Sequence, residues 1–165
     1  SCGIGNFFGM LPASMEKSRI YGVEIDDISG RIAQQLYQKS SISIDGFENV
    51  SLPDSFFDIA VGNVPFGDFK VADRKYDDHN FLIHDYFFAK TLDKVRPGGI
   101  IVFITSKGTL DKENPQVRKY IAQRAELVGA IRLPDDTFKK NAGTEVTSDI
   151  LFLKPCSFFL WSFFG

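Results

Sequence analysis

The fold of this chain is decided by the stretch Val61-Gly62-Asn63-Val64-Pro65-Phe66-Gly67. The apolar run at residues 57–61, which leads into the stretch, is typical of a buried strand. We expect Gly62 and Gly67 to let the backbone turn sharply, and Pro65 to hold the residue before it in an extended conformation. The stretch therefore predicts a rigid loop at the carboxyl end of a strand, where open α/β sheets bind their ligands.

Two side chains of this loop suit a planar substrate that carries an amino group. Asn63 has an amide oxygen that can accept a hydrogen bond from such an amine. Phe66 has a flat face on which a planar ring can stack. A motif this short also occurs as an ordinary strand-ending turn, and that interpretation stays open on these residues alone.

Composition places the chain among globular proteins. It has 165 residues, 44% of them hydrophobic and 24% charged, with a formal net charge of -2. This charge argues against a dominant basic surface, so a nucleic-acid-binding patch would be local or lie outside this chain. Cys2 and Cys156 have no accompanying His/Cys cluster, so we expect no metal site and a reducing, cytoplasmic compartment. The start lacks the pattern of a signal peptide, and the apolar end is too short to span a bilayer.

A glycine turn opens the chain. Gly3 and Gly5 would let the backbone approach a nucleotide-like cofactor after a first strand. The run at residues 19–25 predicts a strand that ends in Glu24, and 24 − 5 gives a spacing of 19 residues from Gly5. An acid about 20 residues beyond a glycine turn is typical of a ribose-hydroxyl ligand. The alternative for Glu24 is a solvated acid at a strand end.

The rest of the chain alternates predicted strands and helices. Further strands are expected at residues 41–44, 100–104, 127–131 and 147–154, with a turn at 96–99 and a charged loop at 68–78. Because the last two strands leave no room for a helix between them, they must be antiparallel. Three helices are predicted between these strands. The first has Ser29 as its cap and an apolar face at Ile28, Ile32 and Leu36. The second begins at residue 79 and has a core stripe at Phe81, Phe88, Leu92 and Val95, and the third is marked by Val117, Tyr120 and Ile121.

Three stretches resemble the N6-adenine DNA methyltransferases of restriction-modification or phage-defence type, some of which are fused to helicases. They are residues 62–67, 97–99 and 143–150. The first is similar to the gamma-like Asn-Pro-Pro-Phe motif, with Val64 in place of the first proline. The resemblance covers residues 1–154. It implies an α/β, Rossmann-like class I S-adenosylmethionine-dependent methyltransferase fold, with a mostly parallel sheet that ends in an antiparallel strand pair.

The resemblance implies roles for the central loop. In that family the Asn side chain and the next backbone carbonyl hold the amine of an adenine that has been flipped out of the DNA duplex. These roles fall on Asn63 and Val64, while Pro65 keeps the loop rigid and Phe66 stacks on the base. The implied reaction is the transfer of a methyl group to the N6 amine of adenine in DNA.

The implied cofactor is S-adenosylmethionine, which Gly3, Gly5, Glu24 and Phe47 would hold. In this fold the loop that contains Phe47 lies beside the adenine ring of the cofactor. Two acids of that loop, Asp45 and Glu48, are candidates for its amine, and the sequence does not choose between them. A buried loop aromatic is the alternative for Phe47.

The ends of the chain suggest a fragment. The glycine motif begins at Ser1, so we expect the first strand of the fold to be missing and residues 1–154 to be a truncated catalytic core. Residues 155–165 would be an artefactual apolar tail, or else an aggregation-prone or partner-docking segment. A specificity subunit, helicase or target-recognition domain would lie elsewhere, and no membrane partner is expected. Two rival functions stay open: a methyltransferase of a protein glutamine or an RNA base, and a non-catalytic truncated fragment.

Overall fold

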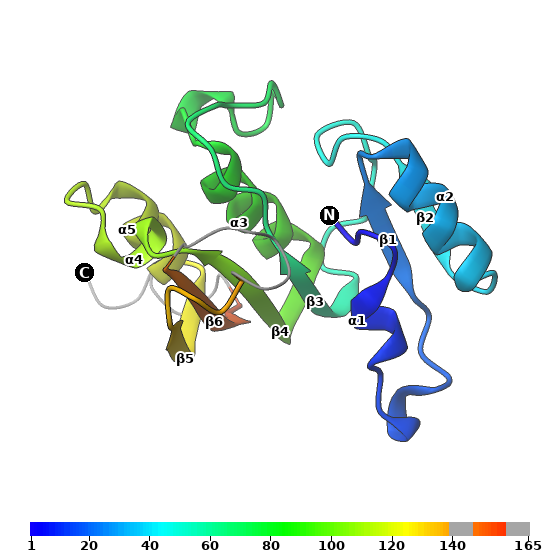
Figure 1. Ribbon diagram of the computed structural model, residues 1–165. Helices are drawn as coiled ribbons and strands as arrows, with labels where there is room; N and C mark the ends of the chain where they lie inside the picture. Colours follow the sequence, from blue (N-terminus) through cyan, green and yellow to red (C-terminus); the bar gives the residue numbers. More distant parts are fainter. Residues whose placement is uncertain (139–146, 158–165) are drawn as a thin grey trace. The chain divides into compact units, whose positions relative to one another are not determined.

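The computed structural model describes residues 1–138 and 147–157 (Figure 1). Within it the chain forms two compact units, residues 1–51 and 52–165. Each unit has its own sheet. The predicted motif residues 143–146 and the tail residues 158–165 lie outside the described residues.

The first unit is a glycine turn followed by a strand–helix–strand motif. Strand β1 (Tyr21–Glu24) pairs in parallel with β2 (Ser41–Ile44), and helix α2 (Asp27–Leu36) connects them. The short helices α1 (Asn6–Gly9) and η1 (Ala13–Met15) precede β1 and were not predicted. The two strands and α2 confirm the sequence-based assignment.

Helix α2 differs from the prediction at its cap. Ser29 lies inside the helix, and the N-cap is Asp26, whose side chain accepts a hydrogen bond of 2.8 Å from the Ser29 N–H. Hydrogen bonding with the Ser29 side chain, together with this bond from its N–H, lowers the pKa of Asp26 below its ordinary value. The predicted apolar face of α2 is exposed, with Ile28 at 70%. The helix instead meets β2 through Gly30, where an added Cβ would lie 2.8 Å from a side-chain carbon of Ile44.

The second unit has a four-stranded sheet in the order β3-β4-β6-β5. Strands β3 and β4 are parallel, and β6 is antiparallel to both of its neighbours, β4 and β5. A mostly parallel sheet with an antiparallel final pair is therefore confirmed, with the last strand inserted between the two before it. The strands are β3 (Phe57–Asn63), β4 (Val95–Ser106), β5 (Ala125–Leu133) and β6 (Ser148–Pro155).

Helices cover one face of this sheet. Helix α3 contacts β4, α5 contacts β5, and the two helices contact each other (Figure 1). Between them and the sheet lies an apolar core that includes Phe88, Ile101 and Leu151, each at most 2% exposed. The predicted core stripe is confirmed as buried, although α3 begins at Ile83, four residues later than predicted. The helices are α3 (Ile83–Lys94), α4 (Gly108–Asp111) and α5 (Gln116–Ala122), with the 3₁₀ turn η2 (Asp77–His79).

The predicted turn at residues 96–99 is a bulge inside β4. The register changes between the pairs Phe57↔Val95 and Ile59↔Ile100, so β4 has extra residues opposite this part of β3. Gly98 takes a φ of +76° there, which a residue with a Cβ rarely adopts. The bulge thus turns the chain from α3 into the sheet without interrupting the strand.

An ion pair fastens β5 to β6. Arg132 and Asp149 are direct cross-strand partners, and both oxygens of the 1%-exposed Asp149 accept hydrogen bonds from the Arg132 guanidinium, at 2.9 and 3.0 Å. Asp111 in α4 accepts a third, at 3.0 Å. The two carboxylates raise the pKa of Arg132 further above its ordinary range. One arginine therefore joins two strands and a helix.

The burial of the two carboxylates should decide their contributions to stability. We expect Asp149→Asn to lower the melting temperature by roughly 3–8 °C, because Arg132 loses the buried carboxylate that accepts two of its hydrogen bonds. Asp111→Asn, which removes the exposed partner of the same arginine, should shift it by about 2 °C or less. Thermal unfolding followed by circular dichroism compares the two variants. Equal shifts would contradict the ranking.

Candidate functional site

The glycine turn of the first unit lies alongside β1. The Cys2 N–H donates to the Val23 carbonyl at 2.9 Å, and the Gly5 N–H donates back to the Cys2 carbonyl at 3.0 Å. Gly3 and Gly5 have φ values of +55° and +89°, which favour glycine at both positions. The turn predicted from Gly3 and Gly5 is therefore present.

Glu24 anchors this turn. Its side chain is 6% exposed, and one carboxylate oxygen accepts a hydrogen bond of 2.7 Å from the Gly3 N–H. The other oxygen accepts one of 3.1 Å from the Asp26 N–H. The structure thus brings Glu24 and the glycine turn together. Because each carboxylate oxygen has two lone pairs, Glu24 retains acceptor capacity beyond these two bonds.

The two glycines differ in what surrounds them. A Cβ added at Gly3 would meet nothing within 4 Å, so the space beside it is open. A Cβ added at Gly5 would lie 2.4 Å from the ring of Tyr37 and 2.9 Å from that of Phe8. Packing against Tyr37 therefore explains Gly5, whereas Gly3 borders a space that a ligand could enter.

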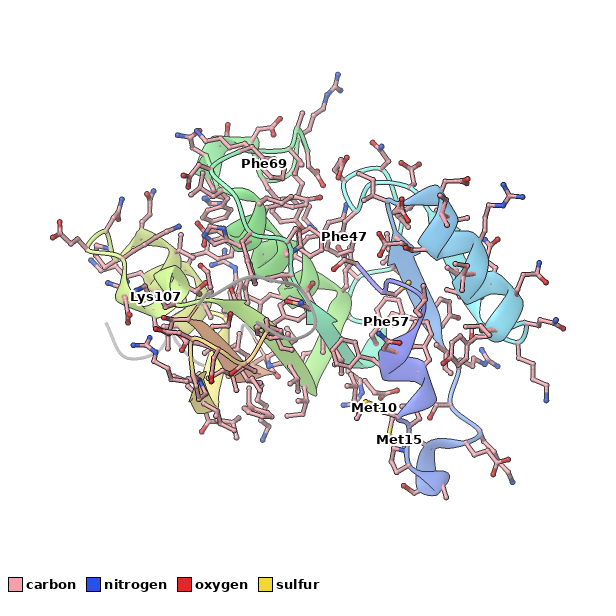
Figure 2. All side chains as sticks on the ribbon, in the orientation of Figure 1. Met10, Met15, Phe47, Phe57, Phe69 and Lys107 are labelled. Carbon is pink, nitrogen blue, oxygen red and sulfur yellow. The ribbon has the colours of Figure 1, made fainter. Side chains whose placement is uncertain are left out.

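The loop after β2 lies next to the end of β1, since the Asp45 N–H donates to the Glu24 carbonyl at 2.9 Å. Phe47 in this loop is half-buried (Figure 2). The Asp45 carboxylate accepts hydrogen bonds from the Asn49 amide and the Gly46 N–H, which lower its pKa. The carboxylate of Glu48 lies against Gly46, where an added Cβ would be 2.1 Å from it. Which of the two acids meets a cofactor stays open.

In the second unit, Asn63 is the last residue of β3 and is exposed. The following residue, Val64, is 2% exposed and belongs to the apolar core, and its N–H donates to the Ile104 carbonyl at 3.0 Å. The pairing of β3 with β4 thus continues one residue beyond Asn63. After the half-buried Pro65, Phe66 is again exposed, at 40%. Asn63 and Phe66 are therefore accessible on either side of Val64, whose position is fixed by burial and by its backbone hydrogen bond.

The prediction that Gly62 turns the backbone sharply was wrong. Neither Gly62 nor Gly67 has a positive φ. Gly62 continues β3, and a Cβ there would make an ordinary contact of 3.5 Å with Phe103. Gly67 leaves room for a neighbour, since a Cβ would lie 2.6 Å from the ring of Phe69. The burial of Val64 and the strand pairing fix the loop instead.

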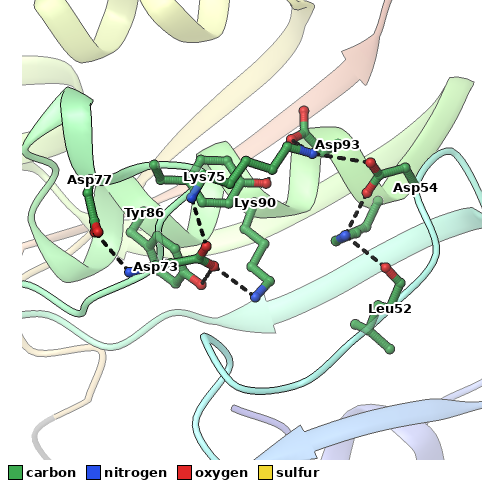
Figure 3. A network of polar contacts seen from close by, with 10 residues as sticks. Leu52, Asp54, Asp73, Lys75, Asp77, Tyr86, Lys90 and Asp93 are labelled. Carbon is green, nitrogen blue, oxygen red and sulfur yellow. Dashed lines mark hydrogen bonds and ion pairs between the residues drawn. The ribbon is translucent and has the colours of Figure 1, made fainter.

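The charged segment after this loop is attached to α3 through buried polar contacts (Figure 3). One oxygen of Asp73 accepts hydrogen bonds from the Tyr86 hydroxyl at 2.7 Å and from the Lys90 ammonium at 3.1 Å. The side chain of Lys90 is 6% exposed and that of Asp73 is 15% exposed. These bonds, together with the nearby positive charge of Lys90, hold the pKa of Asp73 below its usual range, although burial opposes them. The sequence had predicted only a charged loop at residues 68–78.

A second set of contacts lies farther along α3. The Tyr76 hydroxyl donates to Asp93 at 2.7 Å, and Lys75 forms ion pairs with Asp93 and Asp54 at 2.8 and 3.1 Å (Figure 3). Lys94 joins Asp54 as well, at 2.6 Å. The alternation of acids and bases in residues 68–78 is the signal that could have indicated such a network, but it does not specify the partners.

A third polar cluster opens helix α3. The Lys112 ammonium donates to His84 Nε2 at 2.8 Å and to Asp85 Oδ2 at 3.1 Å. Because Nε2 accepts here, the ring proton of a neutral His84 lies on Nδ1. Within the described part of the chain, His84 Nδ1 and Asp85 Oδ1 are buried without a hydrogen-bond partner. Burial lowers the pKa of His84, Lys112 lowers it further, and Asp85 and Asp68 act in the opposite direction.

Among the described residues, His, Cys, Asp and Glu side chains form no group of three that could hold a metal ion. The same residues include no helix that is long and apolar enough to cross a membrane.

Comparison with solved structures defines the fold. A protein from Listeria monocytogenes assigned to the class I S-adenosylmethionine-dependent methyltransferases superposes with a TM-score of 0.75 at 19% identity, over 95% of this chain and 52% of that one. A modification subunit assigned to a type I restriction enzyme of Vibrio vulnificus gives a TM-score of 0.72 at 18% identity, over 93% and 39%. The chain has the class I S-adenosylmethionine-dependent methyltransferase fold, as predicted.

One curated protein is similar in sequence as well. The chain is 36% identical over 160 residues to the Defense against restriction protein B of Escherichia phage P1. The match covers 93% of this chain but only 7% of the phage protein. No protein-family model matches the chain.

The different surroundings of the two glycines can be tested directly. We expect Gly5→Ala to lower the melting temperature clearly, because the new methyl group meets the Tyr37 ring and the φ of +89° disfavours a Cβ. Gly3→Ala has space around it and should cost only about 1 kcal/mol of backbone strain. Differential scanning fluorimetry measures both. A larger loss for Gly3→Ala would show that the turn is packed differently.

The lowered pKa of His84 predicts a pH-dependent stability. The unfolded chain would protonate His84 at about its ordinary pKa of 6.5, whereas the folded chain resists this. Below about pH 6.5 the unfolded state therefore binds more protons than the folded state, and the stability of the fold should decrease as the pH is lowered. We expect the melting temperature to drop between about pH 7.5 and about pH 5.5, and His84→Gln to flatten this dependence. His79→Gln is the matched control and should leave the dependence in place.

Proposed function

We propose that this chain is the catalytic core of an S-adenosylmethionine-dependent methyltransferase that acts on the N6 amine of adenine in DNA. The observation that carries the proposal is the end of β3, where exposed Asn63 and Phe66 flank a Val64 that is fixed by burial and by its hydrogen bond to Ile104. An amide that accepts from an amine, next to an exposed ring, suits a planar base with an exocyclic amine. Position supports this too, because open α/β sheets bind ligands beyond the carboxyl ends of their strands.

The first unit suits the cofactor. Gly3 borders open space, which leaves room for a ligand close to the backbone of the turn. Glu24 lies buried at the end of β1 with acceptor capacity left, which suits the two hydroxyls of a ribose. Phe47, half-buried in the loop after β2, is the candidate to cover the adenine of the cofactor. We assign Gly3, Glu24 and Phe47 to S-adenosylmethionine on these grounds, and Gly5 to the turn that presents Gly3.

When bound, S-adenosylmethionine would supply a sulfonium methyl group to the lone pair of adenine N6, with S-adenosylhomocysteine as the leaving group and the amine proton released to water. The chain itself contributes position and polarity. Asn63 and the Val64 carbonyl accept hydrogen bonds from the two amine protons and so direct the lone pair. Pro65 keeps the loop rigid, and Phe66 stacks on the base once it has left the duplex. No metal ion takes part in this scheme.

The choice of DNA rests on the comparisons together with the loop. The phage relative is described as a protein of defence against restriction, and one solved neighbour as a restriction-enzyme modification subunit. Since the chain spans 7% of the phage protein, target recognition would require a specificity subunit, a helicase or another domain beyond this chain. We place the reaction in the cytoplasm, with no membrane partner.

The test separates methyl transfer from cofactor binding in the full-length protein. Asn63→Ala should lower the methyl-transfer rate by about 10²–10³, because one positioned acceptor is lost, and leave S-adenosylmethionine affinity unchanged. Glu24→Ala should weaken that affinity by at least about tenfold, since it removes charge-assisted hydrogen bonds to the ribose. Radiolabelled transfer with nucleoside analysis measures the first effect, and isothermal titration calorimetry measures the second.

The same assay decides between the rival functions. N6-methyladenine in DNA that disappears with Asn63→Ala supports the proposal. Label that appears only in RNA or in protein glutamine would assign the loop to another amine or amide. A parent protein that transfers nothing to any substrate, even with its partners present, would favour a non-catalytic scaffold.

A further inference from the structure

The segment between β3 and α3 carries a second exposed aromatic ring. Phe69 is 53% exposed, more than Phe66 at 40%, although burial of a phenylalanine is ordinarily favourable. It lies three residues beyond Phe66, and its ring packs against the backbone of Gly67 (Figure 2). Packing of the core therefore does not explain why a phenylalanine occupies this position.

This segment, residues 64–82, is held in one position despite its exposed rings. We call it the arm. At its start Val64 is buried in the core, and near its middle Asp73 is bound by Tyr86 and Lys90 (Figure 3). The Phe69 carbonyl accepts a hydrogen bond of 2.9 Å from the Ile83 N–H at the start of α3. A ring presented from a fixed backbone loses little entropy when it binds.

The charges on the arm do not by themselves favour an anionic partner. Lys70, which donates a hydrogen bond to Asn80, and Arg74 are its exposed cations apart from Lys75, which is paired with Asp54 and Asp93. Against these three bases the arm carries four acids, Asp68, Asp73, Asp77 and Asp78. Ring stacking, more than charge, must therefore supply most of the binding energy.

We propose that Phe69 is a second stacking site, which holds an unpaired nucleobase next to the target base, and that Asp73 is the positioning residue that keeps the arm in place. The proposal rests on the proposed function for the neighbouring base on Phe66. An unpaired strand fits the pattern because every base offers a π-face to an exposed ring, and because Lys70 and Arg74 can meet the adjoining phosphates.

Binding of short single-stranded oligonucleotides tests this without methyl transfer. In the natural polypeptide, with S-adenosylhomocysteine present, fluorescence anisotropy with a labelled deoxyoligonucleotide should show affinity reduced about 5- to 150-fold by Phe69→Ala. Phe69→Trp should restore it. Phe56→Ala is the matched control: Phe56 is 45% exposed but lies at the amino end of β3, so its loss should leave affinity unchanged.

Salt dependence separates stacking from charge. Two phosphates neutralised by Lys70 and Arg74 add about 1.4 to the slope of log affinity against log salt. Phe69→Ala should lower affinity without changing this slope, whereas Lys70→Ala should reduce the slope. Asp73→Asn should weaken oligonucleotide binding and increase hydrogen exchange at the Ile83 N–H, because the arm loses its contact with α3.

The outcomes distinguish this inference from the proposed function. Unchanged oligonucleotide affinity in Phe69→Ala, with methyl transfer still dependent on Asn63, would overturn the stacking site alone and leave the ring to another use such as a protein contact. Affinity that depends on Phe69 in a protein that methylates no substrate would support the stacking site while the proposed reaction fails.

Discussion

The hydrogen bond from the Val64 N–H to the Ile104 carbonyl extends the parallel pairing of β3 and β4 past the last residue of β3. Parallel strands end at the same edge of a sheet, and the helix that connects them begins there. This pairing therefore brings Asn63, the arm and the first turn of α3 to one edge of the second unit. A shift of one residue would turn Asn63 toward the helices and Val64 away from the core.

Buried polar pairs hold the elements that meet at this edge. Asp73 binds α3 through Lys90, Asp85 is bound by Lys112, and Asp149 joins β5 to β6 through Arg132. A charge buried without its partner is costly, so each pair disfavours any arrangement in which its members separate. Of these pairs, Asp73–Lys90 attaches the arm to α3, while the burial of Val64 fixes the start of the arm next to Asn63.

The strands were predictable because the period and apolar content that define them are local. The runs at residues 41–44, 57–61 and 127–131 all became strands, although β3 also includes Gly62 and Asn63, which the sequence placed in the loop. The features that depend on distant partners were not predictable. His84 and Asp85 in the first turn of α3 are bound by Lys112, which lies 28 and 27 residues away in the sequence. The role of Gly62 was misjudged because a glycine in the sequence does not distinguish a turn from the interior of a strand.

A residue whose presence is explained by folding is weak evidence for a reaction. Gly5 is explained by Tyr37, and Glu24 by the turn that it anchors, so both would be selected for folding even without a cofactor. The fold adds little to the evidence for a particular reaction, since one fold can host many reactions. The end of β3 is different: burial explains Val64, but it explains neither Asn63 nor Phe66, which stay exposed on both sides of it. Exposed side chains held at a fixed point of the backbone are available to a substrate, and the proposal of adenine therefore depends on them more than on the glycine turn.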